Sequence, residues 1–232
     1  MAVIGISQSN YLPWKGYFDL INDCDIFVFL DEVQYTKQDW RNRNLIKTKR
    51  GKEWITIPIG KNIKKKIYEV KPINNHWQRK HKKSIQMAYS SCKFYREFEY
   101  ILDHIYQDKN WESLSEFNQY TINLFCKLLN INTKIIDSRE IKKSDDKNQR
   151  LIDIILKLKG NTYLSGGSAK SYLNQSIFQK NNIEIIWKDY SYYPIYPQKY
   201  NNFYHDLSII DLVFNTGKDA SNFIWGYDCK KL

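Results

Sequence analysis

The apolar residues of the chain fall into short runs that alternate between strand-like and helix-like spacing along its whole length. Dense β-branched and aromatic runs predict buried strands, and apolar residues at steps of three and four predict amphipathic helices. The predicted strands are Ala2–Ser7, Asp25–Leu30, Thr133–Asp137, Thr162–Ser165 and Ile183–Trp187. The predicted helices are Trp14–Asn22, His76–Tyr89, Phe94–Gln107, Trp111–Leu129, Asp145–Lys159 and Leu207–Asn215, with short helical pieces at Ala169–Leu173 and Ile177–Asn182.

The first of these units, Ala2–Asp31, indicates the fold class because it reads strand, loop, short helix, strand. Two strands joined through a helix pair in parallel, with a right-handed crossover. Since strands and helices keep alternating, we predict an α/β fold, three-layer and Rossmann-like, with a mainly parallel sheet. The 232 residues fit a single α/β domain over residues 1–232, because single cores stop growing near roughly 250 to 300 residues.

Two further features decorate the predicted sheet. Leu45–Thr48 and Glu53–Ile59 flank a Lys-Arg-Gly-Lys turn and predict a hairpin. Three consecutive helices predict a helical insertion or cap over residues 76–129, within the same domain.

Composition and segment lengths indicate an ordinary globular protein of the cytoplasm. Hydrophobic residues make up 42% of the chain and charged residues 26%. No apolar run approaches the roughly 20 residues of a membrane helix, and the first ten residues do not resemble a signal peptide. The four cysteines, Cys24, Cys92, Cys126 and Cys229, contain no CxxC pair. We expect buried reduced thiols rather than a zinc ribbon or a disulfide framework.

The net charge of +11 makes phosphate-bearing ligands attractive partners. The chain is also rich in Lys, Asn, Ile and Tyr together, which is typical of an AT-rich coding sequence and raises the lysine content without selection for binding. The lysines are spread, apart from two runs at Lys61–Lys66 and Arg79–Lys83. Generic nucleic-acid binding is therefore not expected.

The loop after the first predicted strand, Gln8–Asp19, is the first candidate site, because ligands of open parallel sheets bind at the carboxyl ends of strands near a reversal of strand order. Amides there can donate and accept hydrogen bonds, and Gly16 would let an anion approach the backbone. Alternatively, Pro13 and Gly16 only shape a tight loop with aromatic core residues. The candidate ligand-binding residues of this loop are Gln8, Asn10, Tyr11, Trp14, Gly16 and Tyr17.

The loop after the second strand, Asp31–Asn44, is dense in groups that grip phosphates and sugars. Arg41 and Arg43 offer bidentate forks for phosphate or carboxylate. Asp31, at a buried strand end, could hold a metal, a hydroxyl or an ammonium, and is a candidate catalytic base. The alternative is an exposed polar loop with surface ion pairs. The candidate residues are Asp31, Gln34, Arg41, Asn42 and Arg43.

A third candidate is the turn Ser165-Gly166-Gly167, where a predicted strand runs into a helical piece. Successive backbone amides in such a turn can form an anion nest, with Lys170 close by. The spacing is not that of a P-loop, and two glycines also occur there for steric reasons alone. We expect the three loops to converge into one polar cleft at one edge of the sheet.

The histidines provide one further candidate base. His76 and His81 are five residues apart, which does not suit paired metal ligands on one helix face, so no metal site is predicted. His81 lies in the basic stretch Arg79–Lys83, where like charges disfavour protonation and would leave a neutral base. The alternative is a histidine solvated on its helix, and His104 and His205 are expected to be structural or at the surface.

The segment Tyr190–Tyr204 carries six tyrosines in fifteen residues, and tyrosines offer flat faces for sugars or bases together with a hydroxyl. Tyr196 and Gln198 are its candidate ligand-binding residues. Asp211 follows on an apolar helix face, where a carboxylate must cap, pair or touch a ligand.

Five motifs, in order, resemble the WbqC-like protein family, and they cover the chain nearly from end to end. They are Gln8–Ile21 (QSNYLPWKGYFDLI), Val28–Thr48 (VFLDEVQYTKQDWRNRNLIKT), Trp77–His81 (WQRKH), Tyr163–Leu173 (YLSGGSAKSYL) and Tyr196–Gly217 (YPQKYNNFYHDLSIIDLVFNTG). The family is associated with gene clusters for O-antigen and other surface polysaccharides. The resemblance therefore implies a cytoplasmic enzyme acting on an activated sugar, without naming a reaction.

The first loop is also similar in placement to the nucleotidylyltransferase superfamily, in which a strand is followed by Pro-x-His-x-Gly-His. Pro13 and Gly16 match that pattern, while Tyr17 stands where the second histidine would be and neither catalytic histidine is present. The fold and its phosphate-binding architecture can survive without that chemistry.

Three hypotheses stay open at this point. The first is a transferase that modifies a nucleotide-linked sugar, by N-acylation or aminoacylation of an amino sugar with an acyl or aminoacyl donor. The second is nucleotidylyl transfer or ATP-dependent adenylating ligation with other catalytic residues. The third is a non-catalytic pathway-binding or RNA-binding protein. The sequence does not identify a cofactor.

Overall fold

Five parallel strands form the central sheet of the protein, in a computed structural model that describes residues 2–60 and 64–225. The strands are β1 (Ala2–Ser7), β2 (Ile26–Phe29), β5 (Lys134–Asp137), β6 (Gly160–Gly166) and β7 (Glu184–Lys188), in the spatial order β5-β2-β1-β6-β7. From β1 the chain proceeds outward through β2 to β5, and it then returns to the other side of β1 to form β6 and β7. The strand order therefore reverses between β1 and β6.

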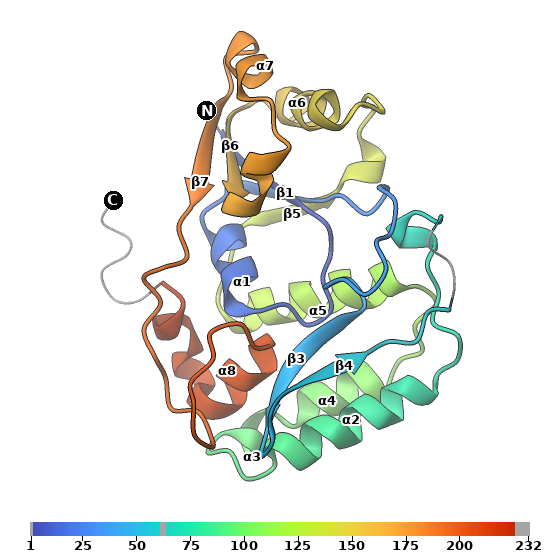
Figure 1. Ribbon diagram of the computed structural model, residues 1–232, viewed down its shortest axis with the longest axis vertical. Helices are drawn as coiled ribbons and strands as arrows, with labels where there is room; N and C mark the ends of the chain where they lie inside the picture. The colour runs from blue at the N-terminus through green and yellow to red at the C-terminus, as the bar shows by residue number, and fades with distance from the viewer. Residues whose placement is uncertain (1, 61–63, 226–232) are drawn as a thin grey trace.

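Helices cover both faces of this sheet and make it the middle of three layers (Figure 1). Along β2 the side chains of Phe27 and Phe29 enter one core, while those of Val28 and Leu30 enter the other. The first core takes α1 (Lys15–Asn22) and α5 (Leu114–Leu128), and the second takes α6 (Lys147–Lys157) and α7 (Gln175–Lys180). The predicted α/β, Rossmann-like fold with a parallel sheet is confirmed.

The predicted hairpin is present as β3 (Arg43–Thr48) and β4 (Gly51–Thr56), with a shorter turn than the sequence indicated. Thr48 pairs with Gly51, and Gly51 has a φ of 109°, a conformation that favours glycine. Two residues, rather than four, therefore form the turn.

The helices that follow the hairpin are α2 (His76–Tyr89), α3 (Tyr95–Phe98) and α4 (Tyr100–Tyr106). The single helix predicted over Phe94–Gln107 is thus two helices that meet at Glu99. Their partners differ, since α3 packs against α8 (Ile209–Thr216) and α4 packs against α2. Local periodicity carries no information about this change of partner.

Helix α8 docks onto the first loop and the hairpin. The backbone N–H of Ile209 donates to the Pro13 carbonyl at 2.9 Å, and that of Ser208 donates to the Leu45 carbonyl at 2.9 Å. Between β7 and α8 the chain runs past α1 without a helix or strand (Figure 1). Lys15 of α1 fixes this segment, because its buried Nζ donates to the carbonyls of Pro194 (3.3 Å) and Phe223 (3.1 Å).

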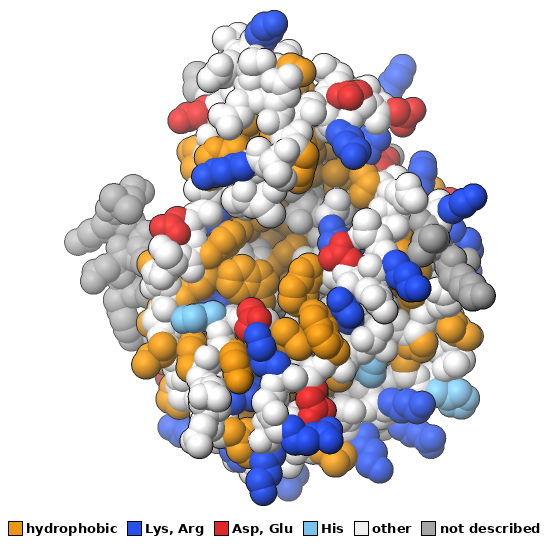
Figure 2. Space-filling model, in the orientation of Figure 1, with side chains coloured by type: hydrophobic (Ala, Val, Ile, Leu, Met, Phe, Trp, Pro, Cys, Tyr) orange, Lys and Arg blue, Asp and Glu red, His pale blue; other side chains and the backbone are white. Residues whose placement is uncertain are grey.

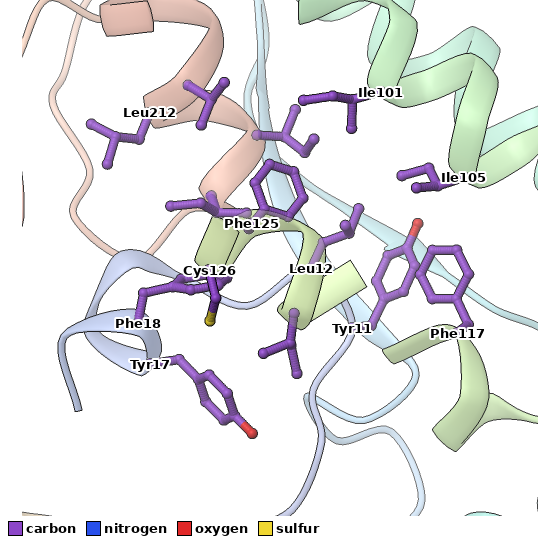
Figure 3. Close-up of a cluster of buried hydrophobic side chains, with 14 of the residues drawn as sticks. Tyr11, Leu12, Tyr17, Phe18, Ile101, Ile105, Phe117, Phe125, Cys126 and Leu212 are labelled. Atoms are coloured by element: carbon purple, nitrogen blue, oxygen red, sulfur yellow. The ribbon is translucent and has the colours of Figure 1, made fainter. Parts of the chain in front are cut away.

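An aromatic core joins the first loop to the helices (Figure 3). The Tyr11 ring stacks on Phe117 of α5 at 5.4 Å between centroids, and Trp77 of α2 packs edge-on against Phe117 at 5.2 Å. Phe18 of α1 packs edge-on against Phe125 of α5 at 6.1 Å. The aromatic residues of the first loop are therefore part of the protein core.

Cys24, Cys92 and Cys126 are free and buried, as expected, and Cys229 lies outside the described residues. Burial raises the pKa of Cys126 to about 12, so its thiol stays protonated and inert. Over residues 2–60 and 64–225, no helix has the length and apolarity needed to cross a membrane.

Candidate functional site

The first and second loops touch at the carboxyl end of β1. The Tyr11 N–H donates to the Trp40 carbonyl at 2.9 Å, and the Arg41 guanidinium donates from Nη2 to the side-chain oxygen of Gln8. A further contact between the loops comes from the Asn44 amide, which donates to the Leu12 carbonyl at 2.8 Å. The two loops are therefore held in one arrangement at the point where strand order reverses.

Asp31 supports this arrangement from inside the protein. Its fully buried carboxylate accepts hydrogen bonds from the Ser9 backbone (2.8 Å), the Ser9 hydroxyl (2.7 Å) and the Gln119 amide (3.0 Å), and also from the Ser115 hydroxyl. Both oxygens are thus engaged by donors from the first loop and from α5. This geometry gives Asp31 a positioning role for the first loop.

Arg41 presents a fixed positive charge at the same edge. Its Nη1 lies 2.6 Å from the Asp39 carboxylate, and the side chain is 16% exposed. Burial alone would raise the pKa of Asp39, but hydrogen bonds from Thr36 and the charge of Arg41 hold it below its usual value. The buried Nε of Arg41 has no hydrogen-bond partner among the described residues.

The turn after β6 faces the first loop through aromatic residues. A Cβ added to Gly166 would lie 3.4 Å from the hydroxyl of Tyr190, whose ring is 5.2 Å from that of Trp14. Gly167 is exposed and would meet nothing within 4 Å. Figure 2 shows the molecular surface hollowed below this region, with hydrophobic side chains inside the hollow and charges of both signs at its rim.

Two exposed tryptophans extend the site on the hairpin side. Trp40 and Trp54 are 41% and 45% exposed, and their ring centroids lie 5.2 Å apart. The Arg43 guanidinium stacks over the Trp54 ring at 4.1 Å, so this predicted phosphate fork is engaged with an aromatic face. Exposed tryptophan faces beside an arginine can stack on a base or on the apolar face of a sugar.

Several predicted ligand-binding residues lie inside the protein. The Tyr17 hydroxyl donates to the Gln8 carbonyl at 2.9 Å, and the Tyr35 hydroxyl donates to Asn42, whose amide donates to the Ile57 carbonyl at 2.9 Å. Ser165 is buried beside the Tyr163 hydroxyl at 3.4 Å. These side chains shape the loops around the hollow.

His81 is buried in the aromatic core rather than solvated on its helix, with 6% of its surface exposed. Its Nε2 faces the Thr56 carbonyl at 3.1 Å and must donate, so its Nδ1 accepts from the Tyr11 hydroxyl at 2.7 Å. Burial lowers the pKa of His81 to about 4. The imidazole is therefore neutral near pH 7, and the cause is burial rather than the neighbouring positive charges that the sequence suggested.

Gly16 has a steric role, because a Cβ there would lie 2.3 Å from the Trp14 ring. Replacing Gly16 by alanine is therefore expected to lower the free energy of unfolding by about 1–3 kcal/mol, as in other overpacked sites. Urea denaturation measures this loss. Gly167→Ala, at an open position, is the matched control and should cost less than about 0.5 kcal/mol; equal losses would contradict the steric role.

A second, separate cluster forms where Tyr196 and Gln198 of the tyrosine-rich segment meet Asp211 of α8. The Tyr196 hydroxyl donates to Asp211 Oδ1 at 2.7 Å, and the Gln198 amide donates to the Tyr196 hydroxyl at 2.8 Å. Lys47 closes the cluster by donating to Gln198 Oε1 at 3.2 Å and to the Asn202 carbonyl at 2.7 Å. The cluster ties the tyrosine-rich segment to α8 and to the hairpin.

Gln34 and Asn10 are the remaining predicted residues. Gln34 is exposed in a short bridge with Lys66, away from the contact of the two loops. Asn10 is partly buried in the first loop, and its buried Oδ1 accepts no hydrogen bond from a described residue. In residues 2–60 and 64–225, no three histidine, cysteine or acidic side chains come close enough together to hold a metal ion.

Sequence reasoning missed the residues that support the site from other elements. Ser115 and Asn118 interrupt the buried face of α5, with the partly buried Gln119 beside them, and the Asn118 amide donates to the Arg41 carbonyl at 2.8 Å. Such polar interruptions on an apolar helix face are a usable signal for hidden partners. Trp54 lies on the open face of the hairpin, and strand alternation alone does not mark it as functional.

Comparison with known proteins gives a consistent result. Residues 8–223 match the WbqC-like protein family. The chain is 37% identical over 227 residues to "Uncharacterized protein Rv1507c" of Mycobacterium tuberculosis (strain ATCC 25618 / H37Rv). The aligned region covers 97% of this chain and 98% of that protein. No solved structure matches the chain. The match over nearly all of its length shows that the chain belongs to the WbqC-like protein family.

Proposed function

We propose that the hollow between the first loop, the second loop and the Gly166-Gly167 turn binds a nucleotide-linked sugar, and that the protein is a transferase modifying that sugar in surface-polysaccharide biosynthesis. The reaction proposed is N-acylation or aminoacylation of an amino sugar. Membership of the WbqC-like family supports a polysaccharide-cluster role.

The observation that carries the proposal is the position of Arg41. Its guanidinium is anchored by Gln8 and Asp39 at the carboxyl end of β1, where parallel sheets with a reversal of strand order bind ligands. A planar, permanently charged fork held in place binds phosphate with little loss of side-chain entropy. The open backbone at Gly167 offers room and N–H donors on the other side of the hollow.

The aromatic pair Trp40 and Trp54 supports a ligand that combines charge with a flat face. Trp40 is adjacent in sequence to Arg41, and its carbonyl is fixed by the Tyr11 N–H. A nucleotide-linked sugar supplies a phosphate for the arginine and a ring for the tryptophans.

An amine must lose a proton as it attacks an acyl group, and a fixed cation or backbone N–H can stabilise the oxyanion that develops. Arg41 and the Gly166-Gly167 turn are the proposed oxyanion and phosphate donors. Asp31 and His81 are enclosed by their own partners, so both have a positioning role in this proposal. The amide bond forms as the bond between the acyl carbon and its thiol or alcohol carrier breaks, and the released carrier takes up the proton that the amine loses.

Arg41→Ala is expected to weaken the binding of a UDP-linked amino sugar by about tenfold or more, because one charge-assisted hydrogen bond is worth roughly 1.5–3 kcal/mol. Because Arg41 is largely buried and holds Gln8 and Asp39, the variant is expected to lose some thermal stability, so the affinities are compared at a temperature at which both proteins are folded. Isothermal titration calorimetry measures the affinity. Arg79→Ala, which removes an exposed arginine of α2, is the charge-matched control and should leave binding unchanged.

A thermal-shift panel separates this proposal from its alternatives, because a ligand at 100 times its Kd adds about 2.7 kcal/mol to stability. The panel contains nucleotide sugars, nucleoside triphosphates with Mg²⁺, acyl-CoAs and RNA. Stabilisation by nucleotide sugars that Arg41→Ala abolishes supports the proposal. Stabilisation by ATP with Mg²⁺ alone would favour adenylation, and stabilisation by RNA alone would remove the transferase hypothesis.

A further inference from the structure

A pocket of about 440 Å³ lies on the same edge of the sheet as the proposed sugar site, beyond the ends of β2 and β5. Its walls come from the residues after β2, the segment before η1 (Ile67–Glu69), the residues after β5 and the first turn of α6. Six cationic side chains line it: Lys64, Lys66, Arg139, Lys142, Lys143 and Arg150. Glu32 and Asp145 are the acidic side chains in its wall.

Three of the cations are held in place by partners. Lys143 lies 2.6 Å from the Glu32 carboxylate, and Arg139 lies 2.8 Å from Asp137. Arg150 donates to the carbonyls of Ser144 and Asp145 at 3.2 and 2.7 Å. On both arginines, Nη1 makes no hydrogen bond to a described residue, so each keeps a free donor on a fixed guanidinium.

The other three cations have no such compensation. Lys64, Lys66 and Lys142 are exposed, and none of them forms an ion pair with a carboxylate in residues 2–60 and 64–225. Unpaired like charges around one concave surface repel each other, and a cleft of one sign focuses the field onto an anion of opposite sign. An anion bound here would relieve this repulsion.

We infer that this pocket is a second binding site, for the diphosphate group of a phosphate-bearing small molecule. A diphosphate carries enough charge to neutralise the three unpaired lysines, and the free Nη1 groups of Arg139 and Arg150 can donate to its oxygens. The pocket volume is that of a small-molecule site. The basic run Lys61–Lys66 of the sequence supplies two of the lining cations, and residues 61–63 lie outside the described residues.

The pocket is distinct from the proposed sugar site. Its lining contains neither Arg41 nor the Gly166-Gly167 turn. A shared wall separates the two sites, because the Gln119 amide donates to both Asp31 and Asp137 at 3.0 Å and Asp137 in turn holds Arg139. Two anionic ligands can therefore be bound side by side on one sheet edge.

Titration of the full chain with inorganic pyrophosphate tests the inference. Lys64→Ala combined with Lys142→Ala removes two exposed, unpaired cations of the pocket, and we expect the Kd for pyrophosphate to rise by about tenfold or more. Lys80→Ala combined with Lys83→Ala removes the same charge from the exposed face of α2, and this control should change the Kd by less than about twofold. Arg41→Ala should leave this binding unchanged while weakening the nucleotide sugar.

Equal losses in the pocket variant and in the α2 control would show a general charge effect and overturn the inference. So would the absence of saturable pyrophosphate binding, or binding confined to RNA or to vesicles containing anionic lipid. ADP is titrated alongside such vesicles, and saturable binding of ADP in the absence of a membrane is the result that the inference expects. If Arg41→Ala did not weaken nucleotide-sugar binding while the pocket variant did weaken pyrophosphate binding, the proposed function would be contradicted and the inference about this pocket would be unaffected.

Discussion

Replacing Asp31 by alanine is expected to lower the free energy of unfolding by about 3 kcal/mol or more, because three buried donors lose their acceptor at a cost of roughly 1 kcal/mol or more each, and the partly buried Gln119 amide loses one of its acceptors. These donors are the Ser9 backbone and hydroxyl, the Ser115 hydroxyl and the Gln119 amide. The substitution would remove a link between two elements, because Ser9 supplies two of the donors from the first loop and α5 supplies the other two. Urea denaturation followed by far-UV circular dichroism measures it.

Asp25→Ala is a matched control for this variant. Asp25 also accepts a hydrogen bond from the backbone N–H that lies 22 residues before it, that of Val3 at 2.7 Å, but it does so at the protein surface. Its replacement should cost only about 1 kcal/mol. Asp31→Asn keeps the volume and one acceptor and should fall between the two. A loss for Asp31→Ala no larger than that for Asp25→Ala would contradict the positioning role.

The sheet itself could be predicted because its signal is local. The run Asp25–Leu30 is apolar on both faces, and β2 indeed sends Phe27 into one core and Val28 into the other. The order of the strands could not be predicted in the same way. The placement of β6 beside β1 depends on pairing such as Ile4 with Tyr163, between residues that are far apart in the chain.

The same distinction between local and long-range signals applies to the candidate site. The sequence indicated which loops are candidates for a binding site, because polar residues directly after buried strands are visible in the pattern. It could not indicate which of their side chains face inward. Asp31 is buried by partners on α5, and His81 is buried by Tyr11 from the first loop and Thr56 from the hairpin. Such long-range contacts decide burial, and periodicity along one segment does not contain them.

Long-range contacts also explain why the two arginines that were predicted to bind phosphate differ in their surroundings. Arg41 and Arg43 are equivalent in sequence, two residues apart in one polar loop. In the structure Arg41 reaches Gln8 at the sheet edge, while Arg43 begins β3 and stacks on Trp54 of the paired strand. The alternation of side chains along a strand and the position of its partner separate their roles.

Asp211 is expected to make the protein less stable as the pH rises from about 4 to about 6, while the buried His81, whose pKa is lowered, makes the opposite contribution over the same range. Burial raises the pKa of this carboxyl to about 6, against the opposing effects of the Tyr196 hydrogen bond and the Lys47 charge. A group whose pKa is higher in the folded than in the unfolded protein binds its proton more tightly when folded. Its contribution is therefore complete below pH 4 and is lost as the pH passes through about 6, a change of about 3 kcal/mol.

Asp211→Asn removes this titration while keeping the size of the side chain and an acceptor for Tyr196. Between pH 4 and pH 7.5, the parent should lose about 3 kcal/mol of unfolding free energy relative to the variant. Urea denaturation at a series of pH values measures it. A difference that stays constant over this range would show that Asp211 does not titrate there.

Tyr196→Phe gives an independent test of the sign. The Tyr196 hydroxyl donates to the charged form of Asp211, and this hydrogen bond lowers the pKa of the carboxyl. Its removal should raise that pKa further and move the loss of stability to higher pH. A shift to lower pH would mean that another group causes the transition.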